Sequence, residues 1–135
     1  MSINRFIKAQ SNGEYEKALK EIQSGRKKSH WIWYIFPQMK GLGYSQMSQY
    51  YGLDKHEVCD YVNNELLFTR LKEITQELIK LDSKDIKDVL GEIDSQKVKS
   101  CMTLFYDYDD VFKEVLKKYY DNKKDQRTTK LLSAK

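Results

Sequence analysis

The sequence predicts an all-α protein, a single compact multi-helix domain covering residues 1–135. Three observations predict this class. Apolar residues recur at steps of three and four along most of the chain, which is the period of a helix that buries one face. Capping residues precede several of these runs, and glycines follow them. No segment offers a convincing partner for a β-strand, and a lone strand leaves its backbone hydrogen bonds unmade.

Composition agrees with one globular domain. The chain is 40% hydrophobic and 33% charged, without internal repeats or a low-complexity linker. No apolar run approaches the roughly 18 residues of a membrane span, and the N-terminal MSINRFIKAQ lacks the apolar segment of a signal peptide. We therefore expect a cytoplasmic protein with no membrane partner.

The first half of the chain predicts three helices before residue 40. Helical spacing covers residues 3–10 and resumes over 15–22, with a stop near Gly25. Residues 29–36 are apolar or aromatic on every side, so we expect a central, surrounded helix. Pro37 lacks an N–H group and ends this element.

The middle of the chain predicts three further helices. Residues 45–51 follow a pair of glycines, and Asp54 with Glu57 three residues later forms a capping-box pattern at the start of the next helix. Leucine and isoleucine then recur at helical steps over residues 66–81, which predicts a long core helix.

Shorter helices follow the long one. Ser83 or Lys84 is expected to begin a short helix that ends at Gly91. Asp94 is expected to cap the next helix, which carries the apolar face of residues 98–105.

The last helices are preceded by acidic residues. Asp107, Asp109 and Asp110 are interpreted as caps for a helix over residues 112–119, in preference to a metal site. Asp125 is expected to cap a final helix over 126–132, which either docks through its leucines or frays.

Charge and cysteine content restrict the possible partners. The net charge is +4, and the segment from Lys113 onward contains eight basic residues and three acidic ones. No aromatic residue interleaves with these charges after Tyr120, so we interpret a solvated surface and do not expect nucleic acid as a partner. Cys59 and Cys101 have no metal-site spacing and are expected to be buried, reduced thiols. We expect neither a metal nor a cofactor.

The stretch from His30 to Gln38, HWIWYIFPQ, is the densest aromatic segment of the chain. Its tryptophans either fill core volume or form a wall of a binding site. The glycines of the following GLGYS either allow a tight turn or let backbone N–H groups face a bound anion, with Lys40 adding positive charge. Aromatic rings beside such a turn suit a ligand with a flat ring and phosphate groups.

These motifs resemble the bacterial domain-of-unknown-function family DUF1810, which automated annotation sometimes labels calpastatin. The resemblance is carried by RFIKAQ, by HWIWYIFPQ with GLGYS, and by Lys97 with SCMTLF at residues 100–105. The chain has no repeated inhibitory segment, so nothing in it supports the calpastatin label. The sequence departs from the family pattern at Ile32, where methionine is usual, and at Asn64-Glu65, where the family has His-Pro.

The resemblance implies a mainly helical domain, and in size and tryptophan content it is similar to domains that handle ADP-ribose derivatives. It also adds to the residues that we expect to bind a ligand. These candidates are Arg5, Gln10, Trp31, Trp33, Gln38, Lys40, Gly41, Gly43, Ser45, Lys97, Ser100 and Thr103. From the residues alone, Ser100 and Thr103 are expected to bond back to the preceding turn, while Lys97 favours a pocket.

Three functions remain open at this point. The first is a binding domain that sequesters a small anionic nucleotide-type ligand, such as an ADP-ribose or NAD derivative, with a tryptophan stacked on its base. The second is a hydrolase for such a nucleotide, with His30 as general acid or base. The third is a protein-interaction domain that uses exposed aromatic residues.

Overall fold

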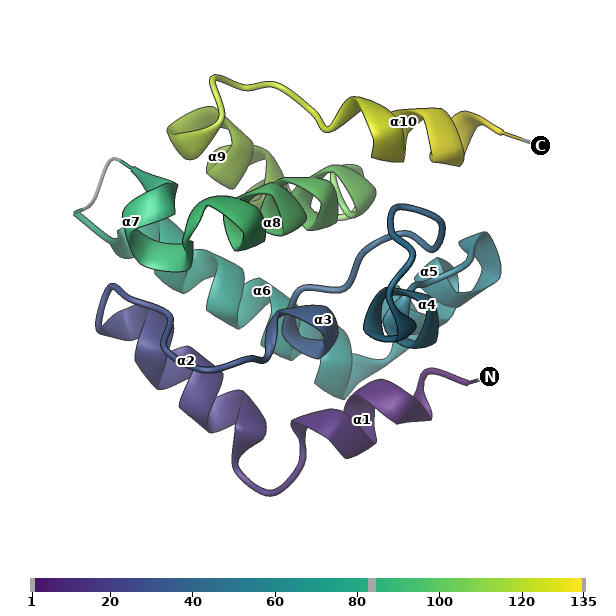
Figure 1. Cartoon of the computed structure of the whole chain (residues 1–135), viewed down its shortest axis with the longest axis horizontal. Coiled ribbons are helices and arrows are strands. Elements are labelled where there is room, and N and C mark those ends of the chain that lie inside the picture. The colour runs from purple at the N-terminus through teal and green to yellow at the C-terminus, as the bar shows by residue number, and fades with distance from the viewer. Residues whose placement is uncertain (1, 83–84, 135) are drawn as a thin grey trace.

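The structure, a computed structural model, describes residues 2–82 and 85–134, and over these ranges it contains ten α-helices and no β-strand (Figure 1). The all-α prediction is confirmed. None of the helices in this part of the chain is long and apolar enough to cross a membrane. The helices are α1 (Asn4–Gln10), α2 (Glu14–Gln23), α3 (Ile32–Ile35), α4 (Gln46–Tyr51), α5 (Lys55–Asn63), α6 (Glu65–Lys80), α7 (Ile86–Leu90), α8 (Glu92–Leu104), α9 (Asp110–Tyr119) and α10 (Gln126–Ser133).

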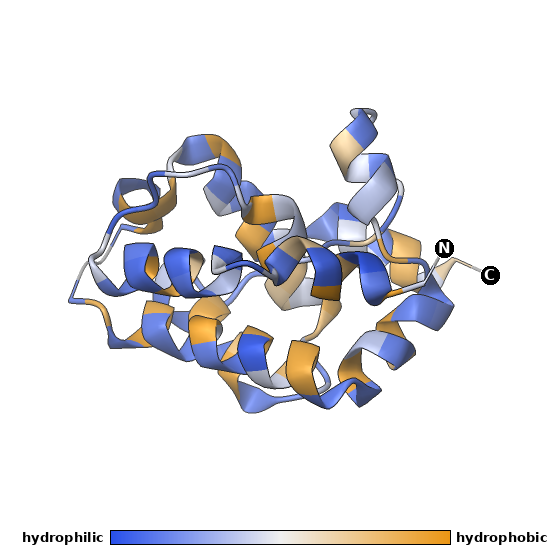
Figure 2. Cartoon of the chain, turned by 90° about the horizontal axis from the view of Figure 1, so that it is seen from below, coloured by the Kyte–Doolittle hydropathy of each residue, from blue (hydrophilic) through white to orange (hydrophobic). Residues whose placement is uncertain are grey.

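The long helix α6 organises the core. It packs against α2, α5 and α9, while α8 packs against α7, α9 and α10 (Figure 1). Its buried positions Leu67, Leu71, Ile74 and Leu78 follow the predicted helical spacing and face one shared hydrophobic core. The helices carry hydrophobic and hydrophilic residues side by side along their length, as amphipathic packing requires (Figure 2).

Side-chain caps fix several helix starts. The predicted capping box is present: Asp54 accepts a hydrogen bond from the backbone N–H of Glu57, whose side chain accepts one from the backbone of Asp54. Asp125 caps α10 as predicted, and Asp109, within the acidic segment, caps α9. Asp85 caps α7; the predicted cap residues Ser83 and Lys84 lie outside the described residues.

One predicted cap is wrong. Helix α8 begins two residues before Asp94, at Glu92, with Gly91 as its N-cap. Gly91 has φ +84°, a conformation that glycine adopts without steric cost, so it separates α7 from α8. Asp94 therefore lies inside the first turn of α8, where its carboxylate contacts lysines.

The predicted helix over residues 29–36 is shorter in the structure, because only Ile32–Ile35 is helical. Glu21 explains the difference. Its carboxylate accepts four hydrogen bonds from the segment before α3, from the backbone of Lys28, the backbone and hydroxyl of Ser29, and the indole of Trp31. These bonds hold the segment against α2 outside a helix, and the chain becomes helical only after Trp31.

Glu21 should make stability depend on pH. Burial raises the pKa of its carboxyl, but the hydrogen bonds from Ser29, Lys28 and Trp31 outweigh burial and lower the pKa to about 2. The unfolded state therefore binds the proton more readily, so this contribution is present above the usual glutamate pKa and is lost as pH falls from about 4.5 toward 2. Denaturant titrations from pH 6 to 2.5 should show this loss. Glu21→Gln should be less stable at pH 6 and flatter over the acid range; a parallel fall in both proteins would contradict the assignment.

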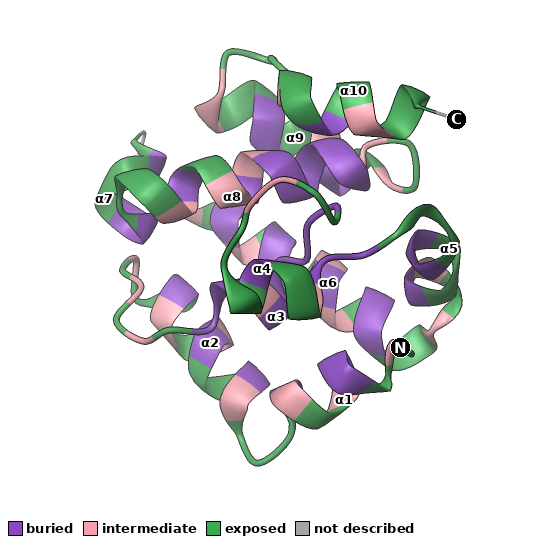
Figure 3. Cartoon of the chain, turned by 45° about the vertical axis from the view of Figure 1, so that its right-hand side comes forward, coloured by how far each residue is buried: buried purple, intermediate pink, exposed green. Residues whose placement is uncertain are grey.

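The segment between α3 and α5 is pinned by a single parallel bridge between Met39 and Leu53. Lys40 N–H donates to the Leu53 carbonyl at 2.8 Å, and Leu53 N–H donates to the Gln38 carbonyl at 2.9 Å. The bridge folds residues 40–52, including the mostly exposed α4, back onto the body of the domain (Figure 3).

Gly52 permits this close return of the chain. A Cβ atom at this position would lie 2.7 Å from the Ser48 carbonyl oxygen and 2.8 Å from the Lys40 Cα atom, so the backbone would have to move. We expect Gly52→Ala to lower the free energy of unfolding by about 1–3 kcal/mol in urea titrations. Gly43→Ala is the matched control, because its Cβ would meet the side chain of Ser48 at 3.1 Å and not backbone. Equal effects of the two substitutions would contradict this explanation.

The prediction that both cysteines are buried is correct for Cys101 and wrong for Cys59. Cys101 is buried in α8, and burial raises the pKa of its thiol. Cys59 is exposed, because it lies on the outer face of α5 while Val58 and Tyr61 point inward.

Candidate functional site

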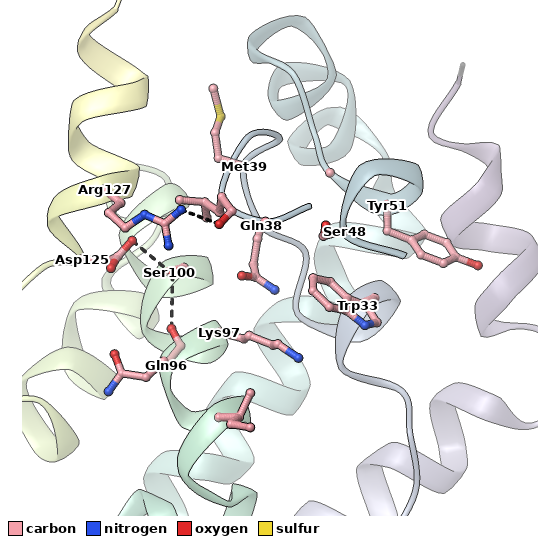
Figure 4. A pocket seen from close by; sticks show the side chains of 14 residues that line it. Trp33, Gln38, Met39, Ser48, Tyr51, Gln96, Lys97, Ser100, Asp125 and Arg127 are labelled. Carbon is pink, nitrogen blue, oxygen red and sulfur yellow. Dashed lines mark hydrogen bonds between the residues drawn. The ribbon is translucent and has the colours of Figure 1, made fainter. Parts of the chain in front are cut away.

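A pocket of about 400 Å³ opens between α8, the start of α10, Trp33 of α3 and the segment that leads through α4 (Figure 4). We call it the Trp33 pocket. Its walls therefore come from segments far apart in the sequence. The lining residues are Trp33, Gln38, Met39, Leu42, Gly43, Ser48, Tyr51, Gly52, Ile93, Gln96, Lys97, Ser100, Asp125 and Arg127.

One side of the pocket pairs an aromatic ring with a cation. The Nζ atom of Lys97, on α8, lies 4.2 Å from the centre of the Trp33 ring, within the range of a cation–π contact. Lys97 also pairs with Asp94 at 3.2 Å, and the other carboxylate oxygen of Asp94 pairs with Lys27 at 2.8 Å. The single carboxylate of Asp94 thus pairs with two ammonium groups, those of Lys97 and Lys27, so this side of the pocket has an excess of positive charge.

The side chain of Gln38 points into the pocket near Trp33 and Lys97 (Figure 4). Gln38 is only 9% exposed, and its amide nitrogen is buried without a hydrogen-bond partner in the structure. Its position is fixed by its own backbone, since its carbonyl accepts the bridge bond from Leu53. A buried donor without a partner costs about 1–3 kcal/mol, so this amide is a polar group held ready for a partner.

The opposite side joins α8 to α10. The carboxylate of Asp125 accepts hydrogen bonds from Ser100, at 3.1 Å, and from the backbone N–H and hydroxyl of Thr128. Arg127 extends its guanidinium toward the turn at residues 41–43, which we call the glycine turn, and donates to the carbonyl of Leu42 (Figure 4). A guanidinium has five N–H donors, so Arg127 has further donors for a ligand.

The pocket brings together five of the predicted residues. Trp33, Gln38, Gly43, Lys97 and Ser100 all line it. As expected from the residues alone, Ser100 and Thr103 also donate to carbonyls of the preceding turn, those of Gln96 and Lys99. Thr103 is buried and accepts a hydrogen bond from the backbone of Asp125, so it supports the pocket from behind.

Several predicted residues have structural contacts in place of a ligand site. Trp31 is 1% exposed and its indole donates to Glu21, so only one of the two tryptophans forms a wall of the pocket. Gln10 is buried, where it donates to the carbonyl of Tyr34 and accepts from Arg70. Neither side chain reaches the pocket.

The prediction that Arg5 meets ligand charge is not supported by its position. Its side chain is buried in a two-pronged ion pair with Glu57, at 2.5 and 3.1 Å. The same guanidinium donates to the carbonyls of Tyr50 and Gly52. Arg5 thus ties α1 to the end of α4, beside the pocket residues Tyr51 and Gly52.

The glycine turn is built for chain reversal more than for anion binding. Gly41 has φ +104° and packs against Leu131, which explains a glycine there. Ser45 lies outside the pocket and caps α4 by accepting from the N–H of Ser48. Lys40 is exposed and does not line the pocket.

His30, the candidate general acid or base, is exposed and lies outside the pocket lining. In contrast, Arg127, Gln96 and Ile93 line the pocket but were not among the predicted site residues. Asp125 was predicted only as a helix cap. No local pattern marks these residues, because their place in the site depends on the packing of α10 against α8.

Comparisons with known proteins agree with this fold. A family profile described as "Protein of unknown function (DUF1810)" matches residues 1–132. The chain is also similar to the conserved hypothetical protein Rv1873 from Mycobacterium tuberculosis, whose crystal structure was determined at 1.38 Å. The two chains are 36% identical with a TM-score of 0.94, over 98% of this chain and 97% of that one. No curated protein matches the chain.

Proposed function

The chain belongs to the DUF1810 family, and on that premise we propose that it is a binding domain whose Trp33 pocket sequesters a small anionic ligand of the nucleotide type. The observation that carries the proposal is the convergence of Trp33, Lys97 and the unpaired amide of Gln38 in one pocket. An aromatic face, a cation and a free amide are the three kinds of group that a flat polar ring with a phosphate requires.

The size and lining of the pocket support this class of ligand. Its volume of about 400 Å³ falls within the range of about 300–1,000 Å³ that is usual for small-molecule sites. Lys97 and Arg127 bring two positive charges to the lining. The described lining has one carboxylate, that of Asp125, which already accepts hydrogen bonds from Ser100 and Thr128. An anionic group therefore meets net positive charge.

Sequestration is favoured over hydrolysis by the position of the titratable groups. General acid–base catalysis requires a group within hydrogen-bond reach of the reacting atoms. His30 is exposed outside the pocket, and Asp125 is engaged as a helix cap. Neither of these two groups is thus placed for proton transfer in the described lining, which favours binding.

Nucleotides should raise the melting temperature. A ligand at one hundred times its dissociation constant stabilises the folded state by about 2.7 kcal/mol, which corresponds to a rise of about 5–15 °C for a domain of this size. Differential scanning fluorimetry with mononucleotides, dinucleotides and ADP-ribose measures the shift, and the matching unphosphorylated nucleosides are the control. Chromatography after long incubation should recover the nucleotide intact. The absence of a shift with any phosphorylated compound at millimolar concentration would contradict the proposal, and conversion of the nucleotide would contradict sequestration.

A further inference from the structure

Of the buried polar side chains that line the pocket, those of Gln38, Ser48 and Ser100, only that of Gln38 makes no hydrogen bond within the described part of the chain. Its amide nitrogen is buried without a partner. Its amide oxygen likewise receives no hydrogen bond from the residues that the structure describes, whereas Ser48, Ser100 and Arg127 each bond to protein groups. The carboxamide thus has one donor and one acceptor that no protein group uses, and turning about its last bond can bring either of them to the pocket.

This free amide is held in a defined place. The bridge bond from Leu53 to the Gln38 carbonyl fixes the backbone, and the residue is more than nine-tenths buried. The side chain points into the pocket near the Trp33 ring and Lys97 (Figure 4). A group fixed beside an aromatic face can pair in plane with the edge of a ring that lies near that face.

We propose that Gln38 reads the edge of the ligand's ring, and that this edge carries a hydrogen-bond donor next to an acceptor. The proposal rests on the proposed function and specifies its ligand class. A carboxamide pairs twice with such an edge, as glutamine does with the amino group and ring nitrogen of adenine. The lactam edge of hypoxanthine or guanine has the same paired chemistry in the opposite order, and an amide matches it by rotating about its last bond.

A ring with acceptors alone satisfies only the amide nitrogen and leaves the amide oxygen without a donor. The pocket should therefore discriminate between rings of the same size and charge. A matched pair of hydrogen bonds discriminates by about 5- to 150-fold in affinity. An ammonium such as Lys97 attracts phosphate equally in both cases, so this discrimination belongs to Gln38.

The test compares AMP and IMP with purine riboside 5′-monophosphate, which keeps the ring and the phosphate but lacks both the amino donor of AMP and the ring N–H donor of IMP. Isothermal titration calorimetry should show that AMP or IMP binds the native protein about 5- to 150-fold more tightly than the purine compound. Gln38→Leu should bind all three alike, at or below the affinity of the purine compound for the native protein. Gln38→Glu keeps the acceptor and loses the donor, so it should weaken all three.

The outcomes separate this inference from the proposed function. Gln38 makes no side-chain bond whose loss would destabilise the fold, so Gln38→Leu should melt close to the native temperature. Gln38→Glu places a carboxylate at a buried position, so it should melt at a lower temperature. If the three nucleotides bind the native protein alike, or if Gln38→Leu discriminates as the native protein does, the inference is overturned and the proposed function stands. If none of the three binds but another phosphorylated nucleotide does, the inference alone is overturned; if no phosphorylated nucleotide binds, both are overturned.

Discussion

Arg5→Ala should lower the free energy of unfolding by about 3–5 kcal/mol, because it leaves a buried carboxylate without its partner. In the folded protein the guanidinium of Arg5 pairs with both oxygens of Glu57, and the side chains are only 4% and 11% exposed. The substitution also removes the donors to the carbonyls of Tyr50 and Gly52. Chemical denaturation followed by circular dichroism measures the loss.

Lys8→Ala is the matched control for this substitution. Lys8 lies on the same helix as Arg5 but is exposed, and its substitution removes the same positive charge. Its effect should stay within about 0.5 kcal/mol. A loss below about 1 kcal/mol in Arg5→Ala would mean that the ion pair is not the buried support described above. Arg5 would then become a candidate for ligand contact again.

Much of the fold could be predicted from local sequence, because helix caps and apolar spacing act over three or four residues. Asp54 and Glu57 form their capping box within one turn, and the long helix shows its buried face in its own leucines. The helix predicted over residues 29–36 is too long because its true start depends on a contact that is distant in the sequence. Glu21, which holds that segment outside a helix, lies on another helix, so no local pattern shows it.

Lys97→Ala should weaken the binding of a phosphorylated nucleotide by about 10- to 150-fold, the usual effect of losing a hydrogen bond to a charged group. Lys97 is the pocket residue whose ammonium lies against Trp33, and it shares Asp94 with Lys27. The loss should be larger in low salt than at 1 M salt, where the Debye length falls to about 3 Å. Titration calorimetry at two salt concentrations measures both effects.

Lys99→Ala separates the pocket from general charge in this experiment. Lys99 lies two residues along the same helix but does not line the pocket, and its substitution changes the net charge by the same amount. It should change affinity less than twofold. Equal weakening by the two substitutions would show that the nucleotide responds to the overall charge of the protein and not to the Trp33 pocket.

The site could be predicted in part. Trp33, Gln38 and Lys97 were expected from their motifs, and they meet in one pocket. Arg5 was expected there as well, yet its partner Glu57 is 52 positions away, and sequence does not distinguish a buried ion pair from a ligand contact. Arg127 was missed because it reaches the pocket only through the docking of α10 on α8. Residues on neighbouring helices become one site only when the helices pack.

A crystal structure of the protein grown with saturating AMP tests the central claim most directly. We expect the nucleotide in the Trp33 pocket, with its ring against Trp33 and its edge paired with Gln38. Its phosphate should lie within hydrogen-bond distance of Lys97 or Arg127. A nucleotide bound elsewhere on the surface, with this pocket empty, would contradict the account.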